Sequence, residues 1–205
     1  MNKPYLIIIA LLLTCAVSAF GAESAAQVLD KAVAKIGVTS TVDCKFRVNS
    51  DTGSVSGALN MAGRKFKLET PHATSWFDGK NMWTANPSTK EITVVNPTNQ
   101  EVRESNPLEY IRGYKADYRV YFSKRKDSAR YLILLNPKAK NSEIKAIEIA
   151  LNKSSLLPER LIIRDKNDKR TTVTISSMSI KSQVKDANYV CPVEKMSDFE
   201  VVDLR

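Results

Sequence analysis

The sequence predicts a mainly β protein with a helical cover, an α+β fold built on one strongly bent antiparallel sheet. Apolar side chains recur at every second residue through most of the chain after Gly37, and turn signals such as Asp78-Gly79 separate these stretches. No alternation of strands with long helices occurs, as a parallel sheet would require. No linker-like stretch divides the 205 residues, so one domain over residues 22–205 is expected.

The first 21 residues are predicted to be a cleaved signal peptide. Lys3 precedes an apolar run from Tyr5 to Val17, which is shorter than the about 20 residues of a membrane-spanning helix, and small residues follow it. Cleavage after Gly21 fits best; the alternatives are cleavage after Ala19 or Ala22. The sequence therefore predicts an exported protein.

A competing interpretation is that Cys15 carries a lipid anchor. Thr14 stands directly before it, where a smaller residue is usual for such a cysteine. The mature protein is therefore expected to be soluble.

Two helical segments are predicted. Ser24 and Gln27 form a capping-box pattern before an amphipathic stretch that Gly37 ends, with apolar residues at helical spacing: Ala25, Val28, Leu29, Ala32 and Ile36. A second, short helix is predicted after Asn106-Pro107, with Leu108 and Ile111 on one face before Gly113. One or two helices are thus expected to cover the sheet.

The strands are predicted by a period of two. Val42, Cys44, Phe46 and Val48 alternate with polar residues, and similar stretches follow at 55–61, 66–68, around Trp83, and at 118–123, 130–135, 144–151, 160–164 and 170–180. In the last stretch the apolar parity changes between Ile175 and Met178. A β-bulge near Ser176-Ser177 would absorb this slip of one residue.

The positive charge of the chain limits the kinds of partner that it would attract. The formal net charge is +9, and removal of the leader takes away only Lys3. Such a field attracts anionic membrane surfaces, nucleic acid or acidic proteins, and export argues against nucleic acid. An oxidising compartment makes a disulfide between Cys44 and Cys191 one interpretation, and two small buried apolar residues are the other.

No constellation in the sequence predicts catalysis, a metal site or a cofactor. His72 is the only histidine, and a zinc site would have to join it to Cys44 and Cys191 without any close pair of ligands. The Gly-Ser-Val-Ser-Gly stretch at 53–57 has its serine one place late for a hydrolase elbow and joins two strands. Nucleotide-binding glycine motifs do not occur. These observations favour a binding protein over an enzyme.

A bent sheet has one concave face, and the strand parity assigns five apolar side chains to it: Phe46, Leu59, Met61, Phe66 and Leu68. Two interpretations remain open. The helices fill this face as an ordinary core, which composition alone favours, or they leave a pocket for an apolar ligand.

The chain resembles the periplasmic outer-membrane lipoprotein carriers, the LolA family. The residues that carry the resemblance are Trp-Phe-Asp-Gly-Lys-Asn-Met-Trp-Thr-Ala-Asn-Pro at 76–87, similar to the family's Asp-Gly-Lys-x-x-Trp-x-x-Asn-Pro hairpin. Further similar pieces follow in the same order at 135–138, 157–165, 189–192 and 201–205.

The resemblance implies an unclosed antiparallel β-barrel whose helix-covered cavity takes up the acyl chains of lipoproteins. It implies transfer from an inner-membrane ABC transporter complex to the outer membrane or an acceptor there, by a monomer without cofactor or catalysis. Residues expected to line the acyl cavity are Phe46, Leu59, Met61, Phe66, Leu68, Trp76, Trp83 and Ile133.

Arg64 is the counterpart, displaced by about one residue, of a family arginine that bonds to the helical cover and holds the empty cavity closed. Because side chains alternate along a strand, this slip also fits a solvated turn residue. Trp76 and Trp83 are expected on adjacent strands. They face each other if the loop is Asp78 to Asn81, whereas a two-residue turn would place Trp83 opposite Thr74.

Two other functions stay open from the sequence. One is a lipid- or partner-binding domain like the envelope-stress sensors of the same fold group. The other is a secreted interaction protein whose core is filled.

Overall fold

A computed structural model describes residues 23–37, 40–181 and 189–205. The predicted signal peptide, with Cys15 and the cleavage sites up to Ala22, lies outside the described residues. Within the described part of the chain, no helix is long and apolar enough to cross a membrane.

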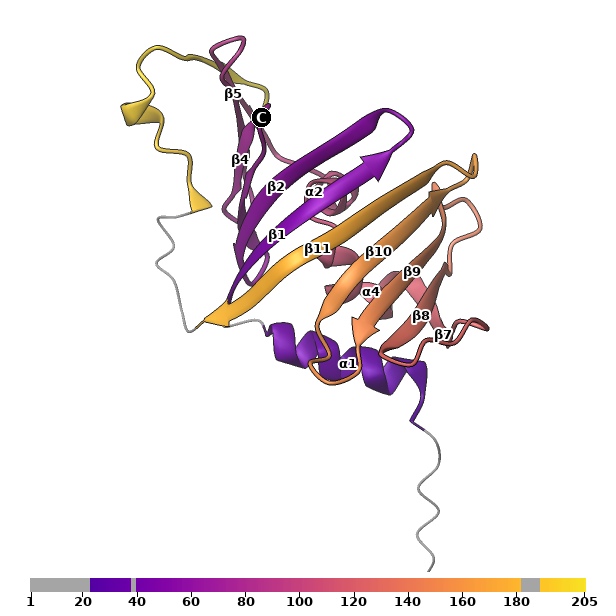
Figure 1. The fold of residues 1–205 in the computed structure, drawn as a ribbon. Helices are drawn as coiled ribbons and strands as arrows, with labels where there is room; N and C mark the ends of the chain where they lie inside the picture. The colour runs from indigo at the N-terminus through magenta and orange to yellow at the C-terminus, as the bar shows by residue number, and fades with distance from the viewer. Residues whose placement is uncertain (1–22, 38–39, 182–188) are drawn as a thin grey trace, which may run out of the picture.

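One large, curved sheet holds the fold together (Figure 1). The described part of the chain contributes twelve strands in the order β12-β6-β5-β4-β3-β2-β1-β11-β10-β9-β8-β7, so that β12 and β7 are edges and the barrel is unclosed. The strands are β1 (Thr41–Ser50), β2 (Gly53–Ala62), β3 (Lys65–Glu69), β4 (Thr74–Phe77), β5 (Met82–Asn86), β6 (Glu91–Val95), β7 (Tyr118–Phe122), β8 (Arg130–Pro137), β9 (Ile144–Asn152), β10 (Pro158–Asp165), β11 (Arg170–Lys181) and β12 (Glu200–Asp203). The mainly β fold with one bent, unclosed sheet is confirmed.

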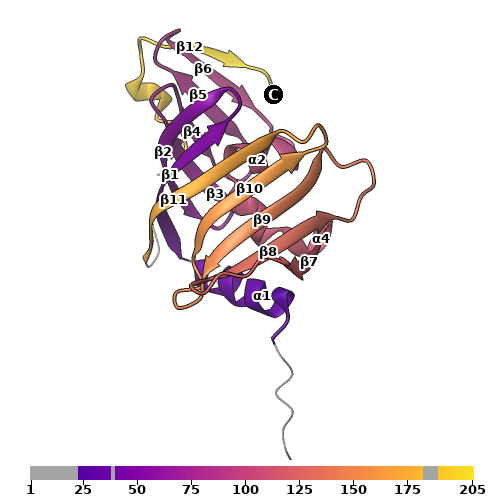
Figure 2. The same cartoon turned by 45° about the vertical axis from the view of Figure 1, so that its right-hand side comes forward.

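One strand departs from the antiparallel expectation. β12 pairs in parallel with β6, Glu200 opposite Glu91 and Asp203 opposite Val94, whereas every other pair of described strands is antiparallel. The C-terminal segment reaches this edge from far along the chain, as Figure 2 shows. A distant segment is free to pair in either direction because no tight hairpin fixes its polarity.

The predicted bulge lies where expected. In the β1–β11 pair, Lys45 is opposite Ser177 and Phe46 is opposite Ile175, so Ser176 is the extra residue. Its hydroxyl donates to the carbonyl of Lys45 at 3.1 Å. The bulge keeps both Ile175 and Met178 packed against the same core despite their different parity.

Within the residues that the structure describes, four α-helices accompany the sheet: α1 (Ala25–Ile36), α2 (Asn99–Ser105), α3 (Leu108–Arg112) and α4 (Tyr114–Asp117). Helix α1 begins at the Ser24 capping box, and its five predicted apolar residues are all buried. In Figure 1, α1 crosses one end of the sheet, and α2 and α4 lie behind the strands. Helices α2 and α4 extend the expected cover of one or two helices.

Two hydrophobic clusters occupy opposite faces of the sheet around β4 and β5. The main core joins the concave face to the helices and includes Phe66, Phe77 and Ile133. The second cluster lies on the other face of β4 to β6 and includes Trp76, Ile92 and Cys191. Neighbouring residues of one strand, Trp76 and Phe77, therefore belong to different clusters.

The hairpin between β4 and β5 has the longer of the two predicted loops. Phe77 pairs with Met82 and Trp76 with Trp83, so the loop is Asp78 to Asn81. The Asp78 carboxylate accepts from the backbone N–H of Lys80 at 2.8 Å and of Asn81 at 2.7 Å. Gly79 adopts a φ of 103°, which side-chain-bearing residues rarely adopt.

Candidate functional site

The concave face of the sheet is covered by α2 and α3, which we call the cover. Helix α2 starts at a capping box in which the Thr98 hydroxyl accepts from Glu101 N and the Glu101 carboxylate accepts from Thr98 N. Val102 and Ile111 point into the main core and are at most 2% exposed. The cover is therefore anchored by apolar packing from two short helices.

Asn106 forms the corner between these two helices. It is fully buried, and its side-chain oxygen accepts from Leu108 N at 3.2 Å while its amide lies 3.7 Å from the sulfur of Met61 on β2. A sulfur is a weak acceptor. The corner is thus well ordered within the cover but only weakly bonded to the sheet.

Two adjoining hollows lie between the cover and strands β1, β2, β3, β9, β10 and β11. The inner hollow is small, about 20 Å³, and almost wholly apolar; its lining is Cys44, Phe46, Leu59, Leu68, Ser105, Pro107, Leu108, Val173 and Ile175. The mouth hollow, about 310 Å³, lies beside it and shares Pro107 and Val173. The apolar part of the mouth lining comprises Val48, Pro107, Tyr110, Ile144, Ile163 and Val173, and its polar part includes Asp51, Gln100, Arg103, Glu104 and Lys169. Apolar walls with a polar rim suit a ligand with an apolar body and a polar end.

The structure brings three of the predicted cavity residues together at the inner hollow: Phe46, Leu59 and Leu68. Met61, Phe66 and Ile133 lie on the same face, but they are at most 1% exposed and form the packed floor of the core. Phe66 packs against Phe77 with ring centres 5.4 Å apart.

Trp76 and Trp83 are not on this face, and their assignment to the acyl cavity is corrected. They pack in the second cluster, under the C-terminal segment that carries Cys191, Val193 and Phe199. Alternation could not exclude this arrangement, because Trp76 and Phe77 are both buried and apolar on opposite faces of β4.

Arg64, the predicted latch, does reach the cover. It lies in the turn between β2 and β3, and its guanidinium donates to the side-chain oxygen of Asn99 in α2 at 2.8 Å. This bond is exposed to solvent, where a single hydrogen bond contributes little.

A second arginine, which the sequence analysis missed, makes the more buried contact at the same turn. Arg112 of α3 donates to the carbonyl of Gly63 and pairs with Glu109 at 3.0 Å, and the side chains of this pair are only 9% and 11% exposed. The sequence showed only a basic residue in the last turn of a short helix, which is common at exposed helix ends. We call the contacts of Arg64 and Arg112 the turn contacts.

The two remaining cysteines are free and buried in the structure. Cys44 belongs to the main core and Cys191 to the second cluster, so the bridge that the sequence left open is not formed. Burial raises the pKa of Cys44 to about 12 and that of Cys191 to about 11, which keeps both thiols protonated and unreactive.

The described residues offer no cluster of histidine, cysteine and carboxylate side chains that would hold a metal ion. His72 lies exposed in the turn between β3 and β4, far in sequence from both cysteines.

Comparisons with known proteins agree with this geometry. Residues 15–167 match the family model described as outer membrane lipoprotein carrier protein LolA. No curated protein matches the sequence.

Among solved structures, an uncharacterized conserved protein from Thermus thermophilus is similar over 87% of this chain and 98% of its own, with a TM-score of 0.58 and 13% identity. A putative outer membrane lipoprotein-sorting protein domain from Vibrio parahaemolyticus is similar over 83% of this chain and 97% of its own, with a TM-score of 0.42 and 12% identity. MucB in the Pseudomonas aeruginosa MucA/MucB complex is similar over 82% of this chain and 62% of its own, with a TM-score of 0.42 and 8% identity. At such identities the likeness extends to the fold alone.

Proposed function

This chain belongs to the LolA family of outer membrane lipoprotein carrier proteins, and from that premise we propose that it binds the acyl chains of lipoproteins between its sheet and its cover. The observation that carries the proposal is the pair of adjoining hollows under the cover, apolar-walled at the mouth and almost wholly apolar inside, which reach from the mouth to Phe46 and Leu68.

Acyl chains need such an enclosure. Each methylene removed from water contributes about 0.8 kcal/mol, so a lipoprotein in solution is strongly driven toward aggregation or back to a membrane. An apolar cavity offsets this cost. The family is one of carriers, and the proposed role requires neither a cofactor nor a catalytic group.

On this proposal, the present structure is the closed form of the site. A mouth hollow of about 310 Å³ is near the lower limit of small-molecule sites, roughly 300–1,000 Å³, and the inner hollow has only about 20 Å³. Several acyl chains would not fit in these volumes. Loading therefore requires the cover to move away from β1 to β3 and expose the surface around Cys44 and Leu59.

The contacts of the cover suit such a movement. Apart from weak contacts of Ser105 and Asn106 with the sulfurs of Met82 and Met61, its polar bonds to the sheet gather at the β2–β3 turn, where Arg64 and Arg112 bind. At the mouth, no hydrogen bond or ion pair joins Gln100, Arg103 or Glu104 to the sheet among the described residues. We propose that the cover swings open at the mouth while the turn contacts guide it.

The proposed route follows from the family. The protein would act in the periplasm, receive lipoproteins from an inner-membrane ABC transporter complex, and deliver them to the outer membrane or to an acceptor there. A monomer is sufficient for this role, because both hollows are lined by one chain.

A lipoprotein-release assay with inner-membrane vesicles tests the proposal. The mature wild-type chain should release lipoproteins into solution, and mass spectrometry of the soluble complex should identify triacylated proteins. Leu68→Glu should remain folded by circular dichroism and lose release, because its carboxylate would lie in the hollow where acyl chains bind. Leu68→Met, which keeps an apolar side chain of similar volume, is the matched control and should retain release.

The other functions predict different results. A protein with a filled core would release nothing and take up no fluorescent apolar probe. A sensor-like domain that binds lipid fragments or a protein partner would take up the probe but release no lipoprotein. A folded Leu68→Glu protein that still releases lipoproteins would contradict the site.

A further inference from the structure

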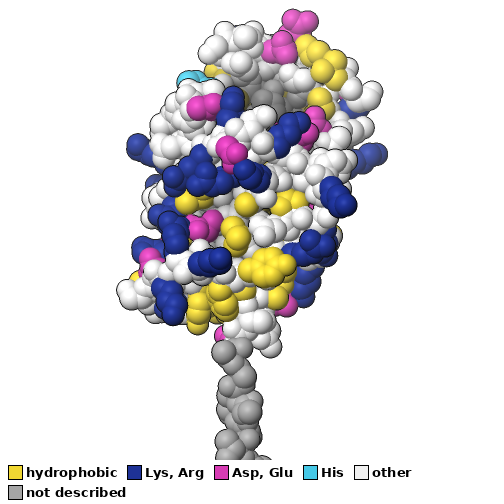
Figure 3. Space-filling model, turned by 90° about the vertical axis from the view of Figure 1, so that its right-hand side faces the viewer, with side chains coloured by type: hydrophobic (Ala, Val, Ile, Leu, Met, Phe, Trp, Pro, Cys, Tyr) yellow, Lys and Arg dark blue, Asp and Glu magenta, His cyan; other side chains and the backbone are white. Residues whose placement is uncertain are grey.

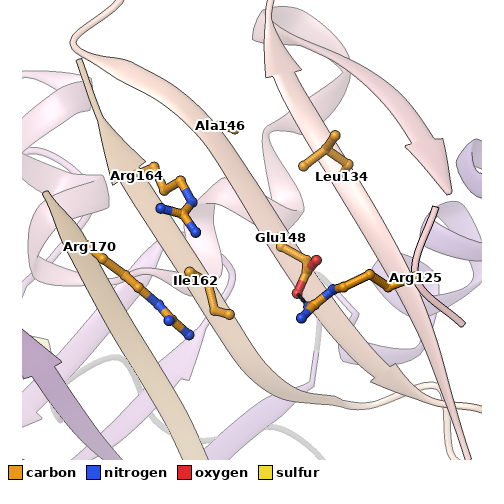
Figure 4. Close-up of a pocket in the computed structure, with 7 residues that line it drawn as sticks. All are labelled: Arg125, Leu134, Ala146, Glu148, Ile162, Arg164 and Arg170. Carbon is orange, nitrogen blue, oxygen red and sulfur yellow. Dashed lines mark hydrogen bonds and ion pairs between the residues drawn. The ribbon is translucent and has the colours of Figure 1, made fainter. Parts of the chain in front are cut away.

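On the outer face of the sheet, two arginines stand directly opposite each other. Arg164 on β10 pairs with Arg170 on β11 in the antiparallel register. Their guanidinium groups lie on the same side of the sheet as Ile162 (Figure 4). Like charges directly opposite each other on neighbouring strands destabilise a sheet. The pair therefore needs an explanation outside the stability of the fold.

Among the described residues, no carboxylate is bonded to either arginine to neutralise its positive charge. Neither guanidinium makes a hydrogen bond or ion pair with a described residue. The nearby carboxylates bind other cations. Asp168 accepts its hydrogen bonds from Lys145 at 2.7 Å, and these bonds, helped by the charge of Arg164, lower the pKa of Asp168. Glu148 forms an ion pair with Arg125. The two arginines thus present fork-shaped donors to the solvent.

The arginines border a hollow of about 270 Å³ on the outer face. Its apolar side chains are Leu134, Ala146 and Ile162, and Ile162 is only 8% exposed. On the far side of this floor, Figure 4 shows Arg125 turned toward Glu148. The hollow spans β8 to β11, about 14 Å at the usual strand spacing, which is the length of a short extended peptide.

We infer that this hollow is a docking site for an acidic segment of a partner protein, with a carboxylate on Arg164 and Arg170 and an adjacent apolar side chain on the Ile162 floor. Arginine forks match carboxylates in two-pronged geometry, and such charge-assisted bonds are among the stronger ones in proteins. A recessed apolar floor requires a side chain that enters it.

An anionic membrane is the competing partner, because lysine and arginine side chains also surround the β7 edge of the molecule (Figure 3). A bilayer surface attracts basic residues by their number and needs no particular pair of them. A curved outer face with a hollow has little shape complementarity to a flat bilayer, and this favours an acidic protein segment as the partner. The site lies on the opposite face of the sheet from the cover, so a partner docked here would leave the cover free to move, and the inference does not depend on lipoprotein carriage.

The test measures binding of fluorescent peptides by anisotropy at about 0.15 M salt, where exposed charges more than about 8 Å apart are screened. The probe is a short peptide that alternates Glu and Leu, and its control has Gln in place of Glu. Arg164→Gln/Arg170→Gln should weaken binding of the Glu peptide about tenfold or more. The matched control, Lys45→Gln/Arg47→Gln, removes the same charge from the outer face of β1 and should change binding less than about threefold.

Separate outcomes would overturn the inference. An equal loss of affinity for the Glu peptide in the two double variants would mean that binding depends only on the net charge of the protein. Binding to phosphatidylglycerol vesicles that depends on Arg164 and Arg170 without any binding of the Glu peptide would assign the site to a membrane. Binding of the Gln peptide as tight as that of the Glu peptide would remove the role of the carboxylate. Ile162→Ala should weaken the Glu peptide as well, and an unchanged affinity would contradict the role of the floor.

Discussion

Two apolar surfaces of the same sheet are covered by non-strand segments, and the two covers differ in how they are held. On the concave face, α2 and α3 pack over the main core and leave the mouth and inner hollows. On the outer face of β4 to β6, the C-terminal segment packs over Trp76 and continues into β12, whose backbone pairs with β6. The C-terminal segment is therefore fixed by backbone pairing at β12, whereas α2 and α3 are held by side-chain contacts.

From this difference we infer that the C-terminal segment is a permanent cover and the helical cover a movable one. A strand addition forms several cooperative backbone hydrogen bonds, and it is further stabilised here by the two tryptophans. The helical cover is bonded to the sheet mainly at the β2–β3 turn. Regions with few buried contacts open locally at lower free energy than the whole domain. Of the four predictions that follow, from the largest expected effect to the smallest, the first two test this contrast and the last two test contacts beside the helical cover.

Trp76→Ala should have the largest effect on stability. Removal of a buried aromatic side chain costs about 3–5 kcal/mol, because it loses burial and leaves a void under the C-terminal segment. Chemical denaturation would measure the loss. Lipoprotein binding by the fraction that stays folded should be unchanged, since Trp76 does not touch either hollow. A loss of binding with little loss of stability would return Trp76 to the ligand site.

Arg112→Met should cost about 3 kcal/mol, the lower part of the range for a broken buried pair, because Glu109 and the Gly63 carbonyl lose their donor. The cover should then open more readily, which hydrogen exchange of α2 and α3 amides would detect. Arg64→Met is the matched control, because it removes an exposed contact to the same turn and should cost below about 1 kcal/mol. Equal effects of the two variants would show that burial does not distinguish the turn contacts.

Gly57→Ala should cost about 1–3 kcal/mol through overpacking. A methyl group there would lie 2.6 Å from the carbonyl oxygen of Glu69 and 2.7 Å from the ring of Phe46, which lines the inner hollow. The ring would be displaced into the hollow and should weaken binding of a fluorescent apolar probe. Phe46→Leu in the same chain makes room for the methyl group and should recover part of the stability. No recovery would locate the strain at the Glu69 backbone instead.

Tyr114→Phe should have the smallest effect, about 1 kcal/mol at neutral pH, because it removes the hydrogen bond at 2.7 Å from Tyr114 in α4 to Asp30 in α1. Hydrogen bonds from Lys115 and from Tyr114 lower the pKa of Asp30 below its ordinary 3.8. Stability from the ionised carboxylate is therefore present above about pH 3.8 and is lost as the pH falls through the lower folded value. The difference between wild type and variant should shrink below that pH, and a constant difference down to acid unfolding would contradict the bond.

Parts of the fold could be predicted from the sequence where one physical signal dominates. The Ser24 capping box and the spacing of five apolar residues predicted α1, and the parity change after Ile175 predicted the bulge at Ser176. Strand parity correctly grouped Phe46, Leu59 and Leu68 on one face. Local rules succeed here because each feature depends on neighbouring residues.

The features that were not predicted depend on which segment covers each face of the sheet. The alternation of apolar and polar residues along a strand does not contain this information. Trp76 and Phe77 are both apolar, so parity alone does not say which of them meets the cover and which meets the C-terminal segment. Helix α2 was missed although Thr98 and Glu101 form a capping box, because the segment is short and buries only Val102. The role of Arg112 required knowledge that the β2–β3 turn lies beside the end of α3.

The two native thiols test the central claim most directly, since Cys44 lies under the helical cover and Cys191 belongs to the C-terminal segment that covers the outer face. Mature chain can be labelled with an alkylating reagent in the native state at increasing denaturant, and the rate at each thiol read by mass spectrometry. We predict that Cys44 reacts through a local opening, faster and with weaker denaturant dependence than Cys191, and that bound lipoprotein slows Cys44 alone. Equal rates with the denaturant dependence of global unfolding at both thiols would contradict a movable cover.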